Sequence, residues 1–207
     1  MTLFRIIRLD PSLTEPCPIE EAVTVLQRGG IIAYPTETVY GLGVDALNEM
    51  AVRRLFEIKS RDFDKPVSVL VRDTVMLRRV VSKVPVVAGS IIEKHWPGPV
   101  TIVFPASRGI PSVLTGQTGT VGVRVSPHPF VRRLFDSFDS PLTATSANIS
   151  GGRSLMEPED ILRTFGGKVD LVISMPEFME GTLSTVIDVT GKSPRIIRQG
   201  AVKVEGI

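Results

Sequence analysis

The chain has 207 residues, enough to bury a large hydrophobic core in one domain without disulfides or a structural metal. Its net charge is only +2, from 24 Lys and Arg against 22 Asp and Glu, so it lacks the basic excess of a protein whose whole surface binds nucleic acid. The single cysteine, Cys17, excludes an intramolecular disulfide and a cysteine-based zinc site. The sequence contains no run of about 18 apolar residues, so no membrane span is predicted. We therefore expect a single cytoplasmic domain over residues 1–207.

Short apolar runs rich in valine and isoleucine recur along the chain, most of them bounded by glycine or proline, as is typical of strands. They predict strands over residues 4–9, 31–34, 67–71, 100–104, 120–125, 169–174, 184–189 and 195–197, with a short strand around 142–145. A turn containing Gly191 and Pro194 separates the last two runs, which predicts an antiparallel hairpin.

Segments with helical spacing lie between these runs. In the first, the apolar residues at 19, 22, 23 and 26 fall on one helical face before Gly29 and Gly30 end the helix. Capping residues and helix-starting prolines predict further helices over 48–59, 73–81, 85–95, 129–138 and 158–165. Because strands and helices alternate, we predict an α/β fold with a mixed central sheet and flanking helices.

The motifs of several common enzyme classes are absent. The two histidines, His95 and His128, have neither the HExxH spacing nor a cysteine partner, so a zinc protease or zinc deaminase is not predicted. The chain also lacks the Walker pattern and the GxSxG motif. The segment 41–46 matches GxGxxA, but six residues separate it from the preceding strand. We interpret these glycines as allowing a tight backbone path in a substrate loop.

Hydroxyl and cationic side chains follow several predicted strands, where open α/β proteins bind ligands. Thr36 and Thr38 follow the strand 31–34, and Ser146 and Asn148 follow the strand around 142–145. The segment 59–66 carries three cations, which suit a polyphosphate or carboxylate. It has an equally weighted alternative interpretation, a solvated charged turn in which Lys59 and Arg61 pair with Asp62 and Asp64.

Taken together, these segments resemble the YrdC/TsaC family, the L-threonylcarbamoyladenylate synthases that begin the N6-threonylcarbamoyl modification of tRNA adenosine. The resemblance rests on an ordered set of motifs: GGIIAYPTETVYGLG at 29–43, KSR at 59–61, WPGPVT at 96–101, VGVRV at 121–125, SANISG at 146–151, STVID at 184–188 and IRQGA at 197–201. It covers nearly the whole chain. It implies a YrdC-like twisted mixed sheet with flanking helices and a concave ligand cleft.

The resemblance also implies an activity. Enzymes of this family join L-threonine, bicarbonate and ATP into threonylcarbamoyl-AMP and release pyrophosphate, with Mg²⁺ present. Such a reaction needs positioning and charge neutralisation more than a strong protein base, which suits a chain without a histidine dyad. The implied partners are these three substrates, the proteins that transfer the threonylcarbamoyl group, and tRNA or double-stranded RNA. No membrane partner is expected.

Site residues are carried over from the family by position. The expected ATP-binding residues are Lys59, Arg61, Lys65, Thr120, Ser146, Ser154 and Arg198. The expected threonine-binding residues are Thr36, Arg124, Ala144 and Ser184, with Arg124 assigned to the threonine carboxylate because a guanidinium binds it through two parallel hydrogen bonds. The expected catalytic residues are Lys59, Arg61, Ser146 and Asn148. Asp45, Asp188 and Glu37 are acidic candidates near the site, but none is assigned as a metal ligand.

The chain departs from the family pattern at three positions. Lys65 and Leu70 stand where many two-domain members have Asn and His, and Leu183 stands where many have Glu. These differences bear on the substrate more than on the fold. Two alternatives therefore stay open: an RNA-binding module that catalyses nothing, which the near-neutral net charge disfavours, and a paralogue that uses the same pocket on another substrate.

Overall fold

The computed structural model describes residues 5–10, 17–175 and 181–205. Its strands are β1 (Ile6–Arg8), β2 (Ile32–Tyr34), β3 (Gly41–Gly43), β4 (Ser68–Leu70), β5 (Val100–Pro105), β6 (Thr120–Arg124), β7 (Leu142–Ser146), β8 (Leu171–Ser174), β9 (Thr185–Asp188) and β10 (Arg195–Arg198). Its helices are α1 (Cys17–Gln27), α2 (Glu49–Ile58), α3 (Thr74–Val80), α4 (Val86–His95), α5 (Pro129–Phe135) and α6 (Pro158–Phe165), followed by the short 3₁₀ helix η1 (Gly166–Lys168).

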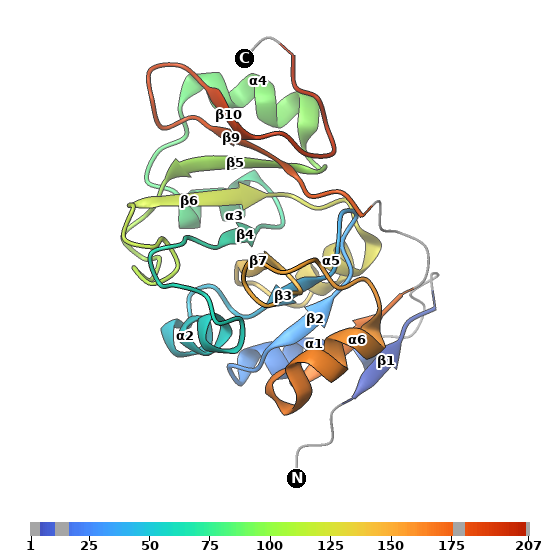
Figure 1. The fold of residues 1–207 in the computed structure, drawn as a ribbon. Coiled ribbons are helices and arrows are strands. Elements are labelled where there is room, and N and C mark those ends of the chain that lie inside the picture. Colours follow the sequence, from blue (N-terminus) through green and yellow to red (C-terminus); the bar gives the residue numbers. More distant parts are fainter. Residues whose placement is uncertain (1–4, 11–16, 176–180, 206–207) are drawn as a thin grey trace.

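The described strands form one mixed sheet in the order β1-β8-β2-β3-β7-β4-β6-β5-β9-β10. The pairs β1–β8, β8–β2, β4–β6 and β5–β9 are parallel, and the other neighbours are antiparallel. In Figure 1 the sheet runs from β2 near the bottom through β4 and β6 to β9 and β10 near the top. The predictions of an α/β fold with a mixed sheet, and of an antiparallel hairpin formed by the last two strands, are confirmed.

Local sequence explains where the helices begin and end. The Asn48 side chain caps α2 by accepting a hydrogen bond from the backbone N–H of Ala51, and Asp73 caps α3 in the same way. Proline stands at the start of α5 and α6, and Gly166, with φ of 51°, follows the last residue of α6. The predicted bounds agree within one or two residues, except that α5 ends at Phe135 instead of Phe138. The first residues of the predicted strand 4–9 include Phe4, which lies outside the described residues.

One prediction about the backbone is wrong. Gly41–Gly43 forms a strand, β3, which pairs with β2 on one side and β7 on the other, and is therefore not a loop. The physical reason is the ring of Tyr34. A Cβ at Gly41 would lie 2.9 Å from this ring and a Cβ at Gly43 would lie 2.7 Å from it. The two glycines therefore give the tyrosine room across the sheet.

Buried apolar residues from the strands and helices form one contiguous core. Helix α1 packs against β2 and α5, and α6 packs against β8. Figure 1 shows α1 and α6 in the lower half of the molecule and α4 at the top. Within the described part of the chain, no helix combines the length and apolar composition that a membrane span requires.

Candidate active site

A cavity of about 200 Å³ lies over one face of the sheet. Its wall includes Ala144 of β7, which is paired with Ser68 of β4, and Thr101 of β5, which is paired with Val186 of β9. Cross-strand neighbours point to the same face of a sheet, so these strands form the floor of the cavity. The sequence placed the site in loops at the strand ends. The cavity is lined by loop residues, from the loop after β2 and the segment that holds Arg61, and also by positions within the sheet.

A glycine in the middle of β6 helps to keep this floor open. A Cβ at Gly122 would lie 2.6 Å from Ser68 Oγ and 3.1 Å from Thr101 Cγ2. Gly122 therefore stands between two polar residues that line the cavity, and it contributes no side chain of its own. Any larger residue at this position would displace one of them.

Three arginines, Arg61, Arg124 and Arg198, line the cavity. Arg61 donates hydrogen bonds to the carbonyl oxygens of Lys65 (3.0 Å) and Pro66 (2.8 Å). Arg198 is held by Ser184, whose carbonyl oxygen accepts two hydrogen bonds (3.1 and 2.9 Å) and whose hydroxyl lies 3.1 Å from Nη2. Several positive charges on one small, partly enclosed cavity favour the binding of an anion.

Burial lowers the pKa of two of these guanidinium groups. Desolvation lowers the pKa of Arg61, although Asp62 and Asp64 oppose the shift. Desolvation also lowers the pKa of Arg198, and the positive charge of Arg124 adds to the effect. Because arginine stays protonated in proteins, both shifts report incompletely solvated charges, and the shift of Arg198 also reports repulsion by Arg124. A bound anion would relieve that repulsion.

Of the three arginines that line the cavity, Arg124 forms an ion pair with a carboxylate, that of Glu37. Its Nη1 donates to Glu37 Oε1 and to Thr38 Oγ1 (3.2 Å). The second carboxylate oxygen of Glu37 accepts a hydrogen bond from Ser126 Oγ. The side chains of Arg124 and Glu37 are 7% and 14% exposed, so this ion pair is shielded from solvent. To the described residues, Nε and Nη2 of Arg124 donate no hydrogen bond, which leaves them available for a ligand.

Lys59 lies behind the cavity wall and does not line it. Its Nζ donates to the carbonyl oxygens of Ser146 (2.5 Å) and Asn148 (2.7 Å) and to Asn148 Oδ1 (2.9 Å). The same Oδ1 accepts a hydrogen bond from Ser146 Oγ (2.8 Å). Lys59 is fully buried. It therefore fixes the chain at the end of β7, where Ser146 faces the cavity.

The burial of Lys59 predicts that the stability of the protein depends on pH. Desolvation, helped by the charge of Arg61, lowers the pKa of Lys59 to about 7, from an ordinary value of 10.5. Between these two values the unfolded chain binds more protons than the folded chain, so the stability that this group contributes rises with pH. We expect the free energy of unfolding of the wild type to increase, relative to Lys59→Met, from about pH 7 towards pH 10. Urea unfolding of both proteins at several pH values measures the difference in the free energy of unfolding. A difference that becomes smaller as the pH rises would contradict the prediction.

The cavity brings together all four residues that the sequence assigns to threonine and part of the ATP set. Thr36, Arg124, Ala144 and Ser184 all line it. The Thr36 hydroxyl donates to the Val39 carbonyl oxygen (2.7 Å) and so shapes the loop after β2. Of the residues assigned to ATP, Arg61, Ser146 and Arg198 line the cavity.

Besides Lys59, three residues assigned to ATP lie outside the cavity wall. Lys65 is exposed and pairs with Asp62 (2.6 Å). Thr120 begins β6 and its hydroxyl lies 2.9 Å from that of Thr118. Ser154 is half-buried in the segment before α6. Their roles therefore stay predictions. The alternative interpretation, a solvated turn with Lys59 and Arg61 paired to Asp62 and Asp64, is wrong: Lys59 is buried against Ser146 and Asn148, and Arg61 donates to backbone carbonyl oxygens.

Sequence reasoning missed several polar residues that line the cavity. Tyr34 is fully buried, and its hydroxyl donates to the Thr143 carbonyl oxygen (2.9 Å); burial raises its pKa. Ser68 lies at the start of β4, and the Thr101 hydroxyl is 2.9 Å from that of Ser184. These residues sit inside predicted strands, where they are read as sheet positions. Tyr34 and Thr101 stand in motifs on which the family resemblance rests, whereas Ser68 has no motif and is placed at the cavity only by the register between strands.

The residues that depart from the family pattern fall in two different places. Leu183 lines the cavity, next to Ser184. Leu70 is fully buried in β4 and does not contribute to the cavity wall. Leu183 is therefore the substitution that can alter the shape of the site directly.

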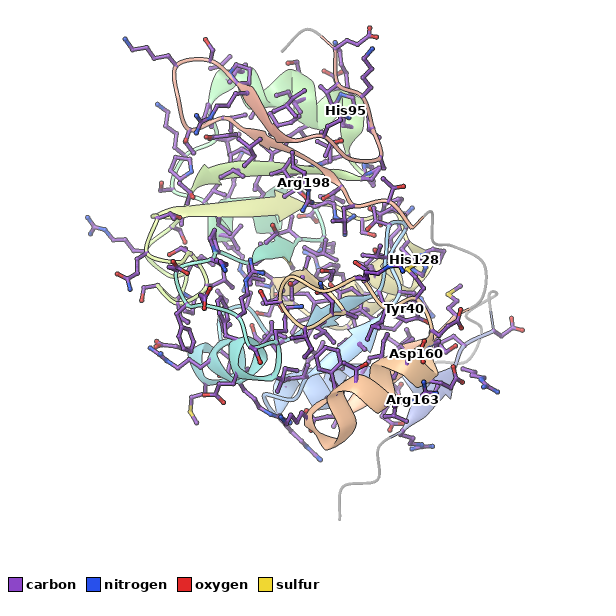
Figure 2. All side chains as sticks on the ribbon, in the orientation of Figure 1. Tyr40, His95, His128, Asp160, Arg163 and Arg198 are labelled. Atoms are coloured by element: carbon purple, nitrogen blue, oxygen red, sulfur yellow. The ribbon has the colours of Figure 1, made fainter. Side chains whose placement is uncertain are left out.

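The acidic residues and histidines do not gather at one point. Asp188 is bound to Arg195 and Thr190, and Asp45 accepts from the backbone of Leu47. Figure 2 shows His95 on α4 near the top of the molecule, well away from His128 and from Arg198 on β10. Among the described residues, no group of three or more His, Cys, Asp or Glu could hold a metal ion.

Known proteins resemble this chain over most of its length. The family model Sua5_yciO_yrdC, described as "Telomere recombination", matches residues 24–200. The threonylcarbamoyl-AMP synthase of Pyrococcus abyssi is 38% identical over 193 residues, which are 93% of this chain and 57% of that protein. The enzyme of the same name from Vibrio cholerae serotype O1 is 37% identical over 184 residues, 88% of this chain and 97% of that protein.

The solved structures agree with the sequence comparison. The crystal structure of P. abyssi Sua5 complexed with L-threonine superposes with a TM-score of 0.89 at 37% identity, over 96% of this chain and 58% of that protein. The chain thus spans little more than half of the longer archaeal relative and nearly the whole of the shorter bacterial one. On its fold, its sequence and the extent of both matches, the chain belongs to the Sua5/YciO/YrdC family.

Proposed function

We propose that this protein is an L-threonylcarbamoyladenylate synthase, a nucleotidyltransferase. It joins L-threonine, bicarbonate and ATP into threonylcarbamoyl-AMP and releases pyrophosphate. The observation that carries the proposal is the cavity lined by Arg61, Arg124 and Arg198 together with hydroxyl groups, in a chain related to enzymes of that name. Its volume of about 200 Å³ suits an amino acid and a reacting phosphate better than a whole nucleotide, whose base would lie outside.

The threonine half of the reaction belongs to the Arg124 side of the cavity. The free N–H groups of Arg124 would bind the threonine carboxylate, and Thr36, Ala144 and Ser184 would surround the rest of the amino acid. The relative from P. abyssi has been crystallised with L-threonine, which supports L-threonine as the amino acid substrate. The threonine amine attacks bicarbonate, forms the N–C bond of a carbamate and releases water.

The phosphate half belongs to Arg61, Arg198 and Ser146. The carbamate oxygen attacks the α-phosphorus of ATP, the bond between the α- and β-phosphates breaks, and pyrophosphate leaves. Negative charge builds up on the phosphate oxygens, where fixed guanidinium groups stabilise it. Lys59 and Asn148 act behind them by fixing the chain that carries Ser146. Lys65, Thr120 and Ser154 are proposed to contact the parts of ATP outside the cavity.

Mg²⁺ would enter as a complex with ATP. Magnesium commonly keeps several water ligands and is bound mainly by substrate phosphates, with one or two carboxylates from the protein. The described residues offer no cluster of acidic ligands, and the cavity wall supplies cations instead, which fits an ion carried by the triphosphate. When bound, the ion neutralises charge on the triphosphate.

Further partners follow from the same proposal. The labile product must pass to proteins that transfer the threonylcarbamoyl group to tRNA, and we propose that these proteins are partners of the chain in the cytoplasm. Direct binding of tRNA or double-stranded RNA is a separate proposal. RNA binding that falls steeply with salt and ignores ATP and threonine would favour the RNA-binding alternative.

Arg124→Ala is expected to raise the KM for L-threonine by about 10- to 100-fold, because a charge-assisted hydrogen-bond pair to the carboxylate is lost. The KM for ATP should change little. Steady-state kinetics of pyrophosphate release measures both constants. The control is Arg163→Ala, which removes an exposed arginine that pairs with Asp160 on α6 (Figure 2). An equal rise in the KM for L-threonine and the KM for ATP would contradict the division of the cavity into two halves.

The test of the proposed function is pyrophosphate release by the purified protein with ATP, Mg²⁺, bicarbonate and L-threonine. Each component is omitted in turn, and L-serine replaces L-threonine in a further reaction. We expect release only when both threonine and bicarbonate are present. Release that is indifferent to threonine would favour a paralogue acting on another substrate.

A further inference from the structure

We infer that Glu37 is a positioning residue for Arg124, and that its carboxylate aims the guanidinium at the substrate carboxylate. The inference rests on the proposed function, because it concerns the threonine half of the same cavity. It concerns a residue that the sequence left without a defined role. Glu37 does not line the cavity, whereas Arg124 does, so it acts through its neighbour.

The geometry fixes the Glu37 carboxylate at both oxygens. Oε1 accepts from Arg124 Nη1, and Oε2 accepts from Ser126 Oγ. Ser126 is itself buried and held in place, since its Oγ accepts a hydrogen bond from the backbone N–H of His128 (3.2 Å). The carboxylate therefore links the loop after β2 to the chain that follows β6, and it occupies one end of the guanidinium.

The charges in the cavity explain why such a partner is needed. Arg198 faces the same space as Arg124, and the charge of Arg124 contributes to lowering the Arg198 pKa. In the absence of substrate the two cations repel each other. Without the Glu37 charge, Arg124 Nη1 would keep only the neutral Thr38 hydroxyl as a partner among the described residues. The guanidinium would then turn away from Arg198, and its Nε and Nη2 would no longer point towards the substrate carboxylate.

The test compares threonine kinetics and threonine binding in four proteins: wild type, Glu37→Gln, Glu37→Asp and Ser126→Ala. Glu37→Gln keeps the shape and removes the charge, so we expect the KM and the Kd for L-threonine to rise about 10- to 100-fold. Glu37→Asp keeps the charge on a shorter side chain and should lie between the wild type and Glu37→Gln. Ser126→Ala keeps the ion pair and should raise the threonine KM about threefold. The KM for ATP is expected to stay within about twofold in all of them.

The control is Glu49→Gln, which removes an exposed carboxylate that also pairs with an arginine, Arg53 (2.6 Å). An unchanged threonine KM in Glu37→Gln would overturn the inference. A fall in kcat together with a rise in both KM values and a lower unfolding midpoint would show a purely structural role. That result would also overturn the inference. If Glu37→Gln does not fold, the other two variants decide. A raised KM for L-threonine with an unchanged KM for ATP in Glu37→Asp and Ser126→Ala supports the inference, and an unchanged KM for L-threonine in both overturns it. Failure of the wild type to bind L-threonine would instead reject the proposed function.

Discussion

Arg61→Ala is expected to slow pyrophosphate release by about 10²- to 10³-fold, the usual cost of removing one fixed group that stabilises charge in the transition state. Arg61 lines the cavity, and its backbone contacts to Lys65 and Pro66 hold its guanidinium in place. Its place on the phosphate side predicts a loss mainly in kcat. Steady-state kinetics with saturating substrates measures the change.

The control for Arg61 is Arg53→Ala. Both guanidinium groups lie 6.0 Å from the centre of a phenylalanine ring, Arg61 over Phe56 and Arg53 over Phe63, but Arg53 does not line the cavity. Arg53→Ala should leave the rate near that of the wild type. A rate for Arg61→Ala within about tenfold of the wild type would remove Arg61 from the proposed phosphate site.

Lys59→Met is expected to reduce both stability and activity. Methionine fills the volume of the side chain but cannot donate hydrogen bonds to the oxygen atoms of Ser146 and Asn148. Leaving buried oxygen acceptors without a donor should cost about 3 kcal/mol of the free energy of unfolding. The chain at the end of β7 would then move, and with it the Ser146 hydroxyl. We expect the rate to fall at least about 10²-fold, because misplaced groups in an active site are costly.

Urea unfolding and single-turnover kinetics separate the two effects of Lys59→Met. The matched control is Lys65→Met, which removes an exposed lysine whose partner is Asp62 (2.6 Å). Its unfolding midpoint should equal that of the wild type. A Lys59→Met protein as stable as the wild type would contradict the clamp, whatever its activity.

Local signals were sufficient to predict most of the elements. Asn48 and Asp73 carry the information for the start of α2 and α3, and alternating valine and isoleucine runs mark the strands. The missed strand β3 has a different origin. Its glycines are selected by the ring of Tyr34 across the sheet, and this contact leaves no periodic signal in the sequence.

The order of the strands could not be predicted, because each strand pattern is compatible with many partners. Strand β8 inserts between β1 and β2, although more than 130 residues separate it from both along the chain, as the registers Ile6 with Val172 and Ile32 with Leu171 show. The floor of the cavity depends on this kind of long-range register. The motif residues Arg61, Arg124, Ser146 and Ser184 were recognisable in sequence, whereas Ser68 became a site residue only through pairing across the sheet.

The structure also gives Lys59 and Arg61 different roles, although the motif suggests the same role for both. Lys59 and Arg61 stand two residues apart in one motif, and the resemblance assigns both to ATP. Their side chains have different surroundings: Lys59 is fully buried against the chain that carries Ser146, and Arg61 lines the cavity. Lys59 thus shapes the site from behind, and Arg61 faces the ligand. Backbone acceptors, which have no sequence signature, decide this difference.

The most direct measurement of the central claim is the mass of the product formed from ATP, L-threonine and ¹³C-bicarbonate. The account predicts threonylcarbamoyl-AMP that carries the single heavy carbon, formed in equal amount with pyrophosphate, and formed about 10²- to 10³-fold more slowly by Arg61→Ala. Adenosine products without the label, or ADP in place of pyrophosphate, would contradict it.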